Sequence, residues 1–334
     1  MANSLLESNI KNYDLPKFVN DIYLDSISQK TRRLYLVYIK RWITFSIEKD
    51  FDARKPTIKW LLLFLASLVR KGISYSAVNV ARSAISFFAP IFEGYKLGAH
   101  PDVCRFLAGV KRRSPKISRY SAVWDVDIVF RFLVELWPLR SLPLNLLVKK
   151  FVVLFLLVTS HRVQSLQVLK VTNLVWPKQD VAVFLLDERL KHVKSQELGF
   201  IQLNAFFSEP KLCVVKCLKE YINRTANLRK GIRYLVLTTT NPIKPASHDT
   251  IARWVSDVLS DAGVDVSCFK PHSTRSASSS KLISLKVPID QVLTKAGWSS
   301  ESTVRKFYDK PIIPDGDVSQ SLIVNFLKKQ KVKT

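Results

Sequence analysis

The sequence predicts a mostly α-helical protein with a small antiparallel β-sheet, and three observations lead to this prediction. Over most of the chain, apolar residues recur at steps of three and four, which is the period of an amphipathic helix. Alternating apolar residues bounded by turn residues are confined to positions 171–203. Apolar residues make up 47% of the 334 residues, which is enough for sizeable cores and excludes disorder as the main state.

The first 112 residues are expected to form a helical domain. Ser28 has the residue type and position of a helix N-cap. The helix after it carries an apolar stripe of Leu34, Val37, Tyr38, Trp42 and Phe45. Further helices are expected after Pro56, from about Ser74, and over 102–111, and this part of the sequence shows no strand pattern.

A basic, proline-broken stretch separates this domain from the rest, and we expect a linker over 113–125 and a second domain over 126–334. A buried helix is predicted over 146–157. Strands are predicted over 171–176, 181–186, 190–194 and 199–203. Helices are predicted over 211–225, 249–262, 273–285, 289–296 and 300–308, with Gly263 and Gly297 at C-caps, and a short amphipathic helix at about 317–328.

The chain is strongly basic, with 52 Lys and Arg against 27 Asp and Glu, a net charge of +25. Such a charge favours a polyanionic partner, because neutralising phosphates releases counterions. An anionic membrane surface is the alternative. The longest apolar runs, 60–69 and 151–158, are too short to span a bilayer, and the N-terminus lacks the pattern of a secretory signal. We therefore expect a soluble, intracellular protein.

The four cysteines are too few for a disulfide scaffold in a chain of this length. Cys213 and Cys217 are four apart and share a helix face, but no further ligands of metal-site spacing accompany them. We expect reduced thiols in the core and no metal site.

A set of cationic, imidazole and aromatic residues suggests chemistry on phosphate. His272 and Arg275 are three apart at the start of a predicted helix, where both face one side beside backbone N–H groups that attract an anion. Upstream, Arg162 ends an apolar helix and Lys194 lies near a predicted hairpin. Downstream follow Trp298, in AGWSS, and Tyr308, in RKFYDKP.

The order of these residues resembles the tyrosine recombinase (phage-integrase-like) family. Within that family, positions 247–311 are most similar to recombinases of the eukaryotic DIRS, Ngaro and crypton mobile elements. The resemblance implies a SAM-like, core-binding N-terminal domain that clamps DNA and an α+β tyrosine recombinase catalytic domain. It also implies site-specific integration or excision of a mobile element, action in the nucleus (otherwise the cytoplasm), and no cofactor or small-molecule substrate.

The resemblance also implies a role for each residue. Tyr308 would attack the DNA phosphorus and form a 3′-phosphotyrosyl bond. Arg162 and Arg275 would hold the phosphate oxygens. His272 would move the proton of the nucleophile, and Trp298 would donate to the phosphate. Lys194 would be the general acid, with Lys191 as the alternative. The catalytic residues predicted are therefore Arg162, Lys194, His272, Arg275, Trp298 and Tyr308, and the chemistry needs no metal. Ser165 stands where the family often has an acidic residue.

Double-stranded DNA is the expected partner, and contacts are expected from basic residues of the first domain and the linker, namely Arg32, Arg33, Lys40, Arg82, Lys111, Arg112 and Arg113. The resemblance implies a homo-oligomer, a ring of four on two duplexes, in which the C-terminal helix binds the neighbouring protomer; packing of this helix on its own protomer is the alternative. Two other functions stay open: a domesticated DNA-binding protein that no longer cuts, and a relaxing enzyme of the type IB topoisomerase kind. Each site residue also has a structural alternative, such as a packed aromatic for Tyr308 or a solvated hairpin lysine for Lys194.

Overall fold

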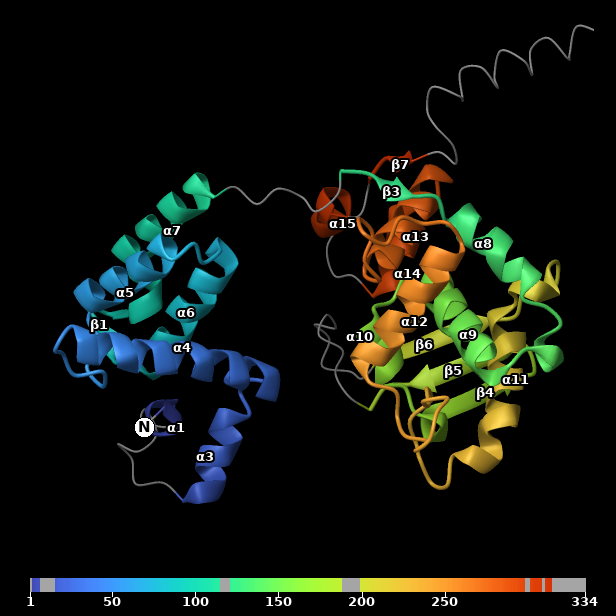
Figure 1. The fold of residues 1–334 in the computed structure, drawn as a ribbon, viewed down its shortest axis with the longest axis horizontal. Helices are drawn as coiled ribbons and strands as arrows, with labels where there is room; N and C mark the ends of the chain where they lie inside the picture. The colour runs from blue at the N-terminus through green and yellow to red at the C-terminus, as the bar shows by residue number, and fades with distance from the viewer. Residues whose placement is uncertain are drawn as a thin grey trace, which may run out of the picture. The chain divides into compact units, whose positions relative to one another are not determined.

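The computed structural model describes residues 2–6, 16–114, 121–187, 199–297, 301–307 and 310–313. The chain divides into two compact units, Met1–Ile117 and Ser118–Thr334. Figure 1 shows the first unit as a helical body and the second as helices around a small sheet. The fold is the mostly helical one with a small antiparallel sheet that the sequence predicts.

The first unit contains short elements around four longer helices. Its elements are α1 (Ala2–Leu6), α3 (Lys17–Leu24), α4 (Gln29–Glu48), α5 (Ile58–Arg70), α6 (Tyr75–Phe88), β1 (Ile91–Phe92), β2 (Tyr95–Lys96), the 3-10 helix η1 (Leu97–Ala99) and α7 (Pro101–Arg113). Helix α6 packs against α4, α5 and α7, so it lies at the centre of the unit. The predicted cap is confirmed, because the Ser28 hydroxyl accepts a hydrogen bond from Thr31 N.

The predicted apolar stripe of α4 is only half right. Trp42 is fully buried and Phe45 nearly so, but Leu34 and Val37 remain 47% and 46% exposed. The buried residues of α4 all lie in its C-terminal half. The helical period predicts which face of a helix is apolar, but it does not predict how much of the length of that face is covered by other helices. The prediction of no strand was also wrong, since β1 and β2 pair as a hairpin of two residues each, too short to show alternation.

The second unit begins with a short strand and continues with helices that precede and follow a hairpin sheet in the chain. Its elements are β3 (Val123–Trp124), α8 (Val126–Glu135), η2 (Leu139–Ser141), α9 (Leu144–Thr159), α10 (Val163–Gln167), η3 (Val171–Asn173), β4 (Leu174–Lys178), β5 (Val181–Leu185), β6 (Phe200–Asn204), η4 (Pro210–Leu212), α11 (Val214–Thr225), η5 (Ala226–Leu228), α12 (His248–Asp261), α13 (Ser273–Ser284), α14 (Ile289–Ala296), α15 (Glu301–Phe307) and β7 (Ile312–Ile313).

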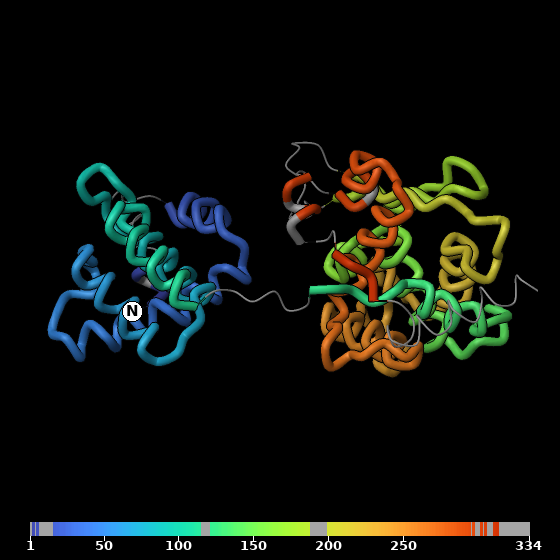
Figure 2. Tube along the Cα trace, turned by 90° about the horizontal axis from the view of Figure 1, so that it is seen from above, coloured from blue at the N-terminus to red at the C-terminus, as the bar shows by residue number. Residues whose placement is uncertain are grey.

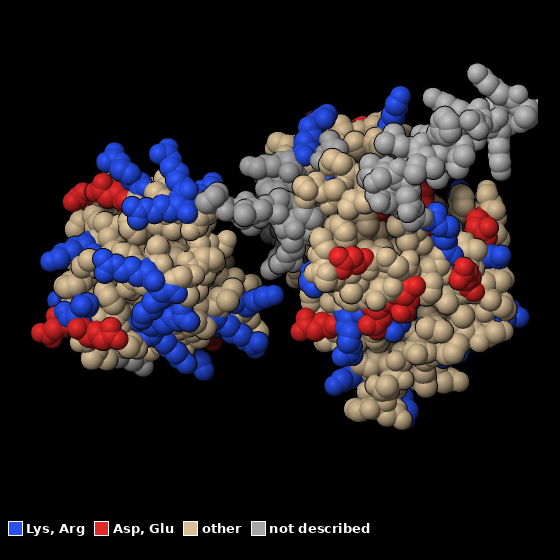
Figure 3. Space-filling view, turned by 45° about the horizontal axis from the view of Figure 1, so that its top comes forward, with Lys and Arg blue, Asp and Glu red and all other residues tan. Residues whose placement is uncertain are grey.

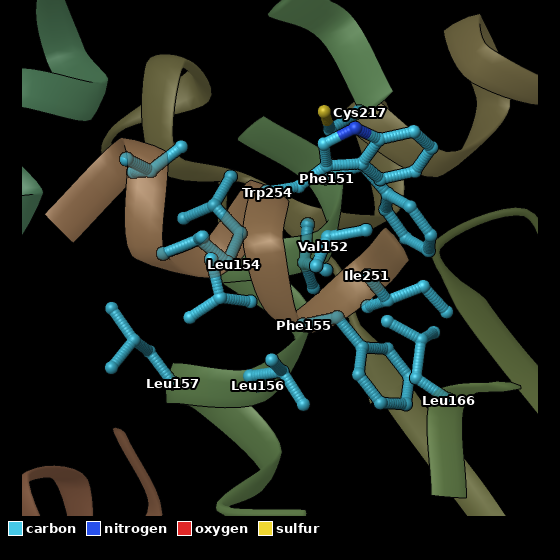
Figure 4. Close-up of a cluster of buried hydrophobic side chains, with 14 of the residues drawn as sticks. Phe151, Val152, Leu154, Phe155, Leu156, Leu157, Leu166, Cys217, Ile251 and Trp254 are labelled. Atoms are coloured by element: carbon cyan, nitrogen blue, oxygen red, sulfur yellow. The ribbon is translucent and has the colours of Figure 1, made fainter. Parts of the chain in front are cut away.

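Helix α9 is the centre of this unit, and it contacts α10, α11, α12 and α13. Figure 4 shows the cluster around it, where Phe151, Phe155 and Leu156 of α9 meet Leu166 of α10 and Ile251 of α12. Because α9 is apolar on nearly all sides, it is buried on nearly all sides, as the run of apolar residues predicts. Its C-terminal end is therefore a rigid point from which a functional residue can be placed.

The predicted hairpin sheet is confirmed in its topology, with strands in the order β4-β5-β6 and both pairs antiparallel. The first strand starts later than predicted, because Val171–Asn173 form a 3-10 turn before β4. The strand predicted over 190–194 lies outside the described residues. The C-cap predictions for Gly263 and Gly297 are supported by positive φ values of 93° and 64°.

One pairing was not predicted. Strand β3 at the start of the unit and β7 near the end of the described chain lie side by side as a parallel pair (Figure 2). The pairing joins Val123 to Ile312 and Trp124 to Ile313. Each strand has two residues, which is too short for any sequence pattern, and the pairing is set by long-range contacts.

Two further expectations concern the membrane and the cysteines. In the part of the chain that the structure describes, no helix has both the length and the apolar character needed to cross a bilayer. All four cysteines are free thiols, as predicted, but only Cys213 and Cys217 lie in the core, since Cys104 and Cys268 are exposed.

Lys150 is a lysine inside the apolar helix α9, and it generates a test of the core. Its side chain is fully buried, and Nζ donates to Leu136 O at 2.6 Å. Burial lowers the pKa of Lys150 from 10.5 to about 8. Between pH 8 and pH 10.5 the unfolded chain binds more protons at Lys150 than the folded one, so the free energy of unfolding rises with pH over this range.

We expect the free energy of unfolding of the wild type to rise by about 3 kcal/mol more than that of Lys150→Met between pH 7 and pH 10.5. Urea unfolding followed by circular dichroism at several pH values measures the difference. Lys149→Met is the matched control, since Lys149 is the neighbouring residue but is half-buried and paired with Asp257. A difference between wild type and Lys150→Met that does not change with pH would contradict the expectation.

Candidate active site

Arg162 follows the buried helix α9 through a left-handed residue. The helix ends at Thr159, and Ser160 takes φ 53° and ψ 23°, a conformation that costs a non-glycine residue about 1–2 kcal/mol. The Ser160 hydroxyl lies 2.8 Å from the Ser278 hydroxyl of α13, and this buried hydrogen bond helps to hold the turn. Arg162 then stands at the N-cap of α10 and is half-buried.

Arg275 lies on α13, whose residues 273–280 are all buried. Most of them are serine, and such small residues allow α13 to approach α9 closely. The Arg275 side chain is only 2% exposed, and its Nη1 donates to Ser160 O at 2.6 Å. This hydrogen bond joins α13 to the turn that carries Arg162, so two segments far apart in the sequence meet here.

Arg162 and Arg275 line one cavity of about 410 Å³. Its other walls come from α10, from β6 and the residue before it, and from the C-terminal end of α14, and they include Ser165, Gln202 and Gly297. No Asp or Glu occurs among the described residues that line it. Guanidinium groups stay charged and bind phosphate oxygens in a fixed, bidentate geometry. The cavity is therefore suited to a phosphate group.

His161 also lines this cavity, and the sequence analysis did not single it out. It is 8% exposed, and its backbone N–H donates to Thr159 Oγ1 at 3.3 Å. Burial, together with the charges of Arg275 and Arg162, lowers the pKa of His161 to about 4. Its only signal in the sequence is its place directly before Arg162, which does not distinguish a site residue from a core residue.

The predicted lysine lies outside the described residues, as does its alternative, so Lys194 and Lys191 remain predictions. The chain reaches the cavity on both sides of the segment that holds them. Leu186 and Gly199 both line it, and Leu186 N donates to Gly199 O at 3.0 Å. The segment between them therefore starts and ends at the cavity wall.

Trp298 and Tyr308 also lie outside the described residues, but their neighbours are held in place. Gly297 lines the cavity and forms the C-cap of α14 with φ 64°, a left-handed conformation that glycine adopts without strain. Beyond the tyrosine, Lys310 N donates to Ser280 Oγ of α13 at 3.1 Å, and Pro311 O accepts from Val123 N at 2.8 Å.

Residues of the strand β3 region support α13 from a second side. Trp124 Nε1 donates to Ser273 Oγ at 2.9 Å in a buried contact at the start of the helix. Lys281 binds Asp125 and Asp127 at 2.9 and 2.6 Å. Burial opposes the charge of Lys281, but the hydrogen bonds to Asp127 and Asp125 outweigh it, so the pKa of Lys281 is raised. The helix that carries Arg275 is thereby fixed at both ends.

His272 occupies the N-cap position of α13 and is exposed. It lies three residues before Arg275, as predicted, but it is not among the described residues that line the cavity. Its role stays a prediction.

The basic residues predicted to contact DNA fall into two groups in the structure. Arg33 and Lys40 of α4 are exposed, as are Lys111, Arg112 and Arg113 at the end of α7. Lys and Arg side chains gather on the face of the first unit that Figure 3 shows.

The other two are half-buried and bound within the unit. Arg32 Nη2 lies 3.6 Å from Asp25 Oδ1, and Arg82 donates to Asn79 Oδ1 and to Gly98 O. Among the described residues, no group of three or more His, Cys, Asp or Glu could hold a metal ion.

Comparison with known proteins identifies the class. The phage integrase family matches residues 143–311, half of the chain, and the protein belongs to this family. No curated protein sequence matches significantly.

Solved structures match in fold. The Tn1549 transposon integrase in complex with transposon right end DNA superposes with a TM-score of 0.56 at 14% identity, covering 98% of each chain. XerH site-specific recombinase bound to its palindromic difH substrate gives a TM-score of 0.56 at 14% identity, covering 83% of this chain and 75% of that one. A lambda integrase dimer bound to a COC′ core site gives a TM-score of 0.51 at 15% identity, covering 90% of this chain and 96% of that one.

The lowered pKa of His161 predicts an acid-sensitive site. Between pH 6.5 and about 4, His161 is protonated in the unfolded chain but neutral in the folded protein. The free energy of unfolding therefore falls as the pH falls through this range. As the pH falls over this range, we expect the free energy of unfolding of the wild type to decrease by about 3 kcal/mol more than that of His161→Gln. Urea unfolding at each pH measures the loss, with the exposed His248→Gln as control. Equal acid sensitivity of wild type and His161→Gln would show that the imidazole is not held neutral.

Proposed function

We propose that the protein is a site-specific DNA recombinase that cleaves and rejoins DNA strands through a 3′-phosphotyrosyl intermediate, for integration or excision of a mobile element. The observation that carries the proposal is the pair of Arg162 and Arg275 in one cavity. Gly199 and Gly297 also line this cavity. Gly199 follows the segment that holds Lys194, and Gly297 directly precedes Trp298. Membership in the phage integrase family gives independent support.

The chemistry follows from the residue types. The Tyr308 phenol attacks phosphorus, and the covalent phosphotyrosyl bond conserves the energy of the phosphodiester until a second strand attacks it. Arg162 and Arg275 stabilise the charge that gathers on the two non-bridging oxygens. The 5′-oxygen leaves with a proton from Lys194, or from the alternative Lys191, since a partly desolvated lysine has a lowered pKa and is a better acid.

Two more residues complete the proposed site. His272 accepts the proton of the attacking phenol, a task that suits an imidazole near neutral pH. Its exposure at the start of α13 leaves it accessible to DNA. The Trp298 indole N–H donates to the phosphate. Both assignments rest on the resemblance to the family.

Double-stranded DNA is the proposed partner. Residues 1–112 act as the core-binding clamp, 113–125 as the linker and 126–334 as the catalytic domain. The exposed cations Arg33, Lys40 and Lys111 contact the phosphates, whereas the half-buried Arg32 and Arg82 act on the DNA contact through the loops and helices that they hold.

The proposed assembly is a ring of four protomers on two duplexes, in which a helix at about 317–328 of one protomer binds the next. The lambda integrase in the comparison is a dimer on its core site. The similarity of positions 247–311 to DIRS, Ngaro and crypton recombinases suggests a eukaryotic mobile element and action in the nucleus.

A nicked duplex from the ends of the element tests the reaction, because the short strand is lost after cleavage and the covalent adduct accumulates. We expect the wild type to form this adduct and Tyr308→Phe to form none. Arg275→Ala should slow adduct formation by about 10²–10³-fold, the range for loss of one stabilising donor. Denaturing gels of the protein with labelled DNA measure both.

The outcomes distinguish the alternatives. Equal trapping by wild type and Tyr308→Phe would refute the nucleophile. Specific binding without any adduct would favour a domesticated DNA-binding protein. Relaxation of any supercoiled plasmid, without site preference, would favour a type IB topoisomerase-like enzyme.

The salt dependence of binding tests the clamp. Because each phosphate contact releases about one counterion, Lys40→Gln and Arg33→Gln should each reduce the slope of log K against log salt by about 1, on any DNA sequence. Fluorescence anisotropy with a labelled duplex between low and moderate salt measures the slope. Lys59→Gln is the control, since Lys59 is an exposed cation of the same unit that packs over Trp60. Unchanged slopes for Lys40→Gln and Arg33→Gln would place the DNA elsewhere on the unit.

A further inference from the structure

The imidazole of His161 occupies a place in the cavity that its neighbours make unusual. The ring is buried, and it lines the same cavity as the two arginines. A Cβ at Gly297 would lie 3.7 Å from His161 Cε1, so the ring packs beneath the left-handed turn that directly precedes Trp298. In the described part of the chain, the ring makes no hydrogen bond, although the backbone of the same residue is held by Thr159.

A purely structural role explains these facts poorly. An imidazole keeps a ring N–H that can donate a hydrogen bond, and neither ring nitrogen of His161 is among the buried atoms left without a partner in the described chain. Here the ring faces a cavity whose described lining holds no carboxylate. An apolar residue of the same volume would fill the space beside Gly297 but could not donate to a ligand in the cavity.

We propose that His161 is a third phosphate-contacting residue of this site, whose ring N–H donates to a non-bridging oxygen of the phosphate held by Arg162 and Arg275. The proposal deepens the recombinase function and rests on it, and it concerns a residue outside the set predicted from the sequence. The contact needs no movement of the backbone, since all three side chains already line one cavity.

Binding of a phosphate changes the electrostatic balance at His161. Among the described residues, the charged groups that act on it are Arg162, from its own turn, and Arg275, from α13. The described residues of α9 and α14 that line the cavity near it carry no charge, namely Thr159, Thr294, Ala296 and Gly297. Without a bound anion, burial and the charges of Arg275 and Arg162 favour the neutral imidazole. An anion between them offsets their charge, so the imidazole gains affinity for a proton when the phosphate binds.

Nuclear magnetic resonance of the full-length protein tests this contact without requiring catalysis. Side-chain ¹⁵N signals of the five histidines are followed from pH 8 to about pH 3.5, a range that includes the pKa of His161, with and without inorganic phosphate. His161 is assigned by the loss of its signal in His161→Gln. We expect phosphate to move the titration of His161 upward by about one pH unit or more, the effect of an opposite charge nearby. The exposed His248 serves as internal control. A His161 titration that phosphate leaves unchanged would overturn the proposal.

Cleavage kinetics supply the second measurement. His161→Leu keeps the volume but removes the donor, and we expect adduct formation on nicked DNA to slow by about 10–100-fold, the range for a hydrogen bond to a charged group. His161→Asn and His161→Gln place an amide N–H near Nδ1 and Nε2, and the one that retains more activity identifies the donating nitrogen. Thermal unfolding verifies that His161→Leu is folded. A folded His161→Leu that cleaves at the wild-type rate would overturn the proposal.

The two measurements separate this inference from the proposed function. If the wild type forms no adduct with any DNA but phosphate shifts His161, the contact is supported and the recombinase function fails. If the wild type forms the adduct while His161 responds in neither measurement, the inference fails and the recombinase function stands.

Discussion

The hydrogen bond from Arg275 Nη1 to Ser160 O, at 2.6 Å, is the contact on which the site depends. It joins the end of the most buried helix of the second unit to the serine-rich helix α13. Together with the hydrogen bond between the Ser160 and Ser278 hydroxyls, it fixes the segment that carries Arg275 against the turn that precedes Arg162. A buried guanidinium loses its hydration, so it needs fixed acceptors, and a carbonyl released from the end of a helix is such an acceptor. The left-handed Ser160 exposes that carbonyl to α13.

The serines of α13 make this approach possible, at some cost in polar groups. Ser278 and Ser279 lie within hydrogen-bond distance of the Arg275 carbonyl, and Ser278 also meets Ser160, so most of the buried hydroxyls are satisfied close to the site. The Ser276 hydroxyl is buried with no partner among the described residues. A helix of leucine or isoleucine would have packed more apolar surface but would have held α13 further from α9. The sequence therefore favours close approach of the arginine over maximal burial.

Much of this arrangement follows from the sequence, and the exceptions have physical reasons. Helix 289–296 has the predicted bounds, because a proline starts it and a glycine ends it. The proximity of Arg162 and Arg275 could be predicted only from the order of residue types along the chain, because hydrophobic periodicity carries no information on contacts between distant segments. The same limit hid the β3–β7 pairing and left Leu34 and Val37 wrongly assigned to the core. His161 was missed because a single histidine at the end of an apolar helix has the same local pattern whether it is core or site.

The described lining of the cavity holds two guanidinium groups and no carboxylate, which determines what the cavity can bind. Where the family often has an acidic residue, Ser165 lines the wall, so a counter-charge that would orient Arg162 and compete with the substrate is missing from that position. Two close positive charges repel each other more strongly in a partly buried site than in water, and this energy is released when an anion enters. In the reaction that we propose, the phosphate supplies the missing counter-charge. Its binding would relieve the repulsion, and the negative charge that it gains in the transition state would be stabilised more than its ground state. The proposed chemistry therefore needs no carboxylate in the described lining of the cavity.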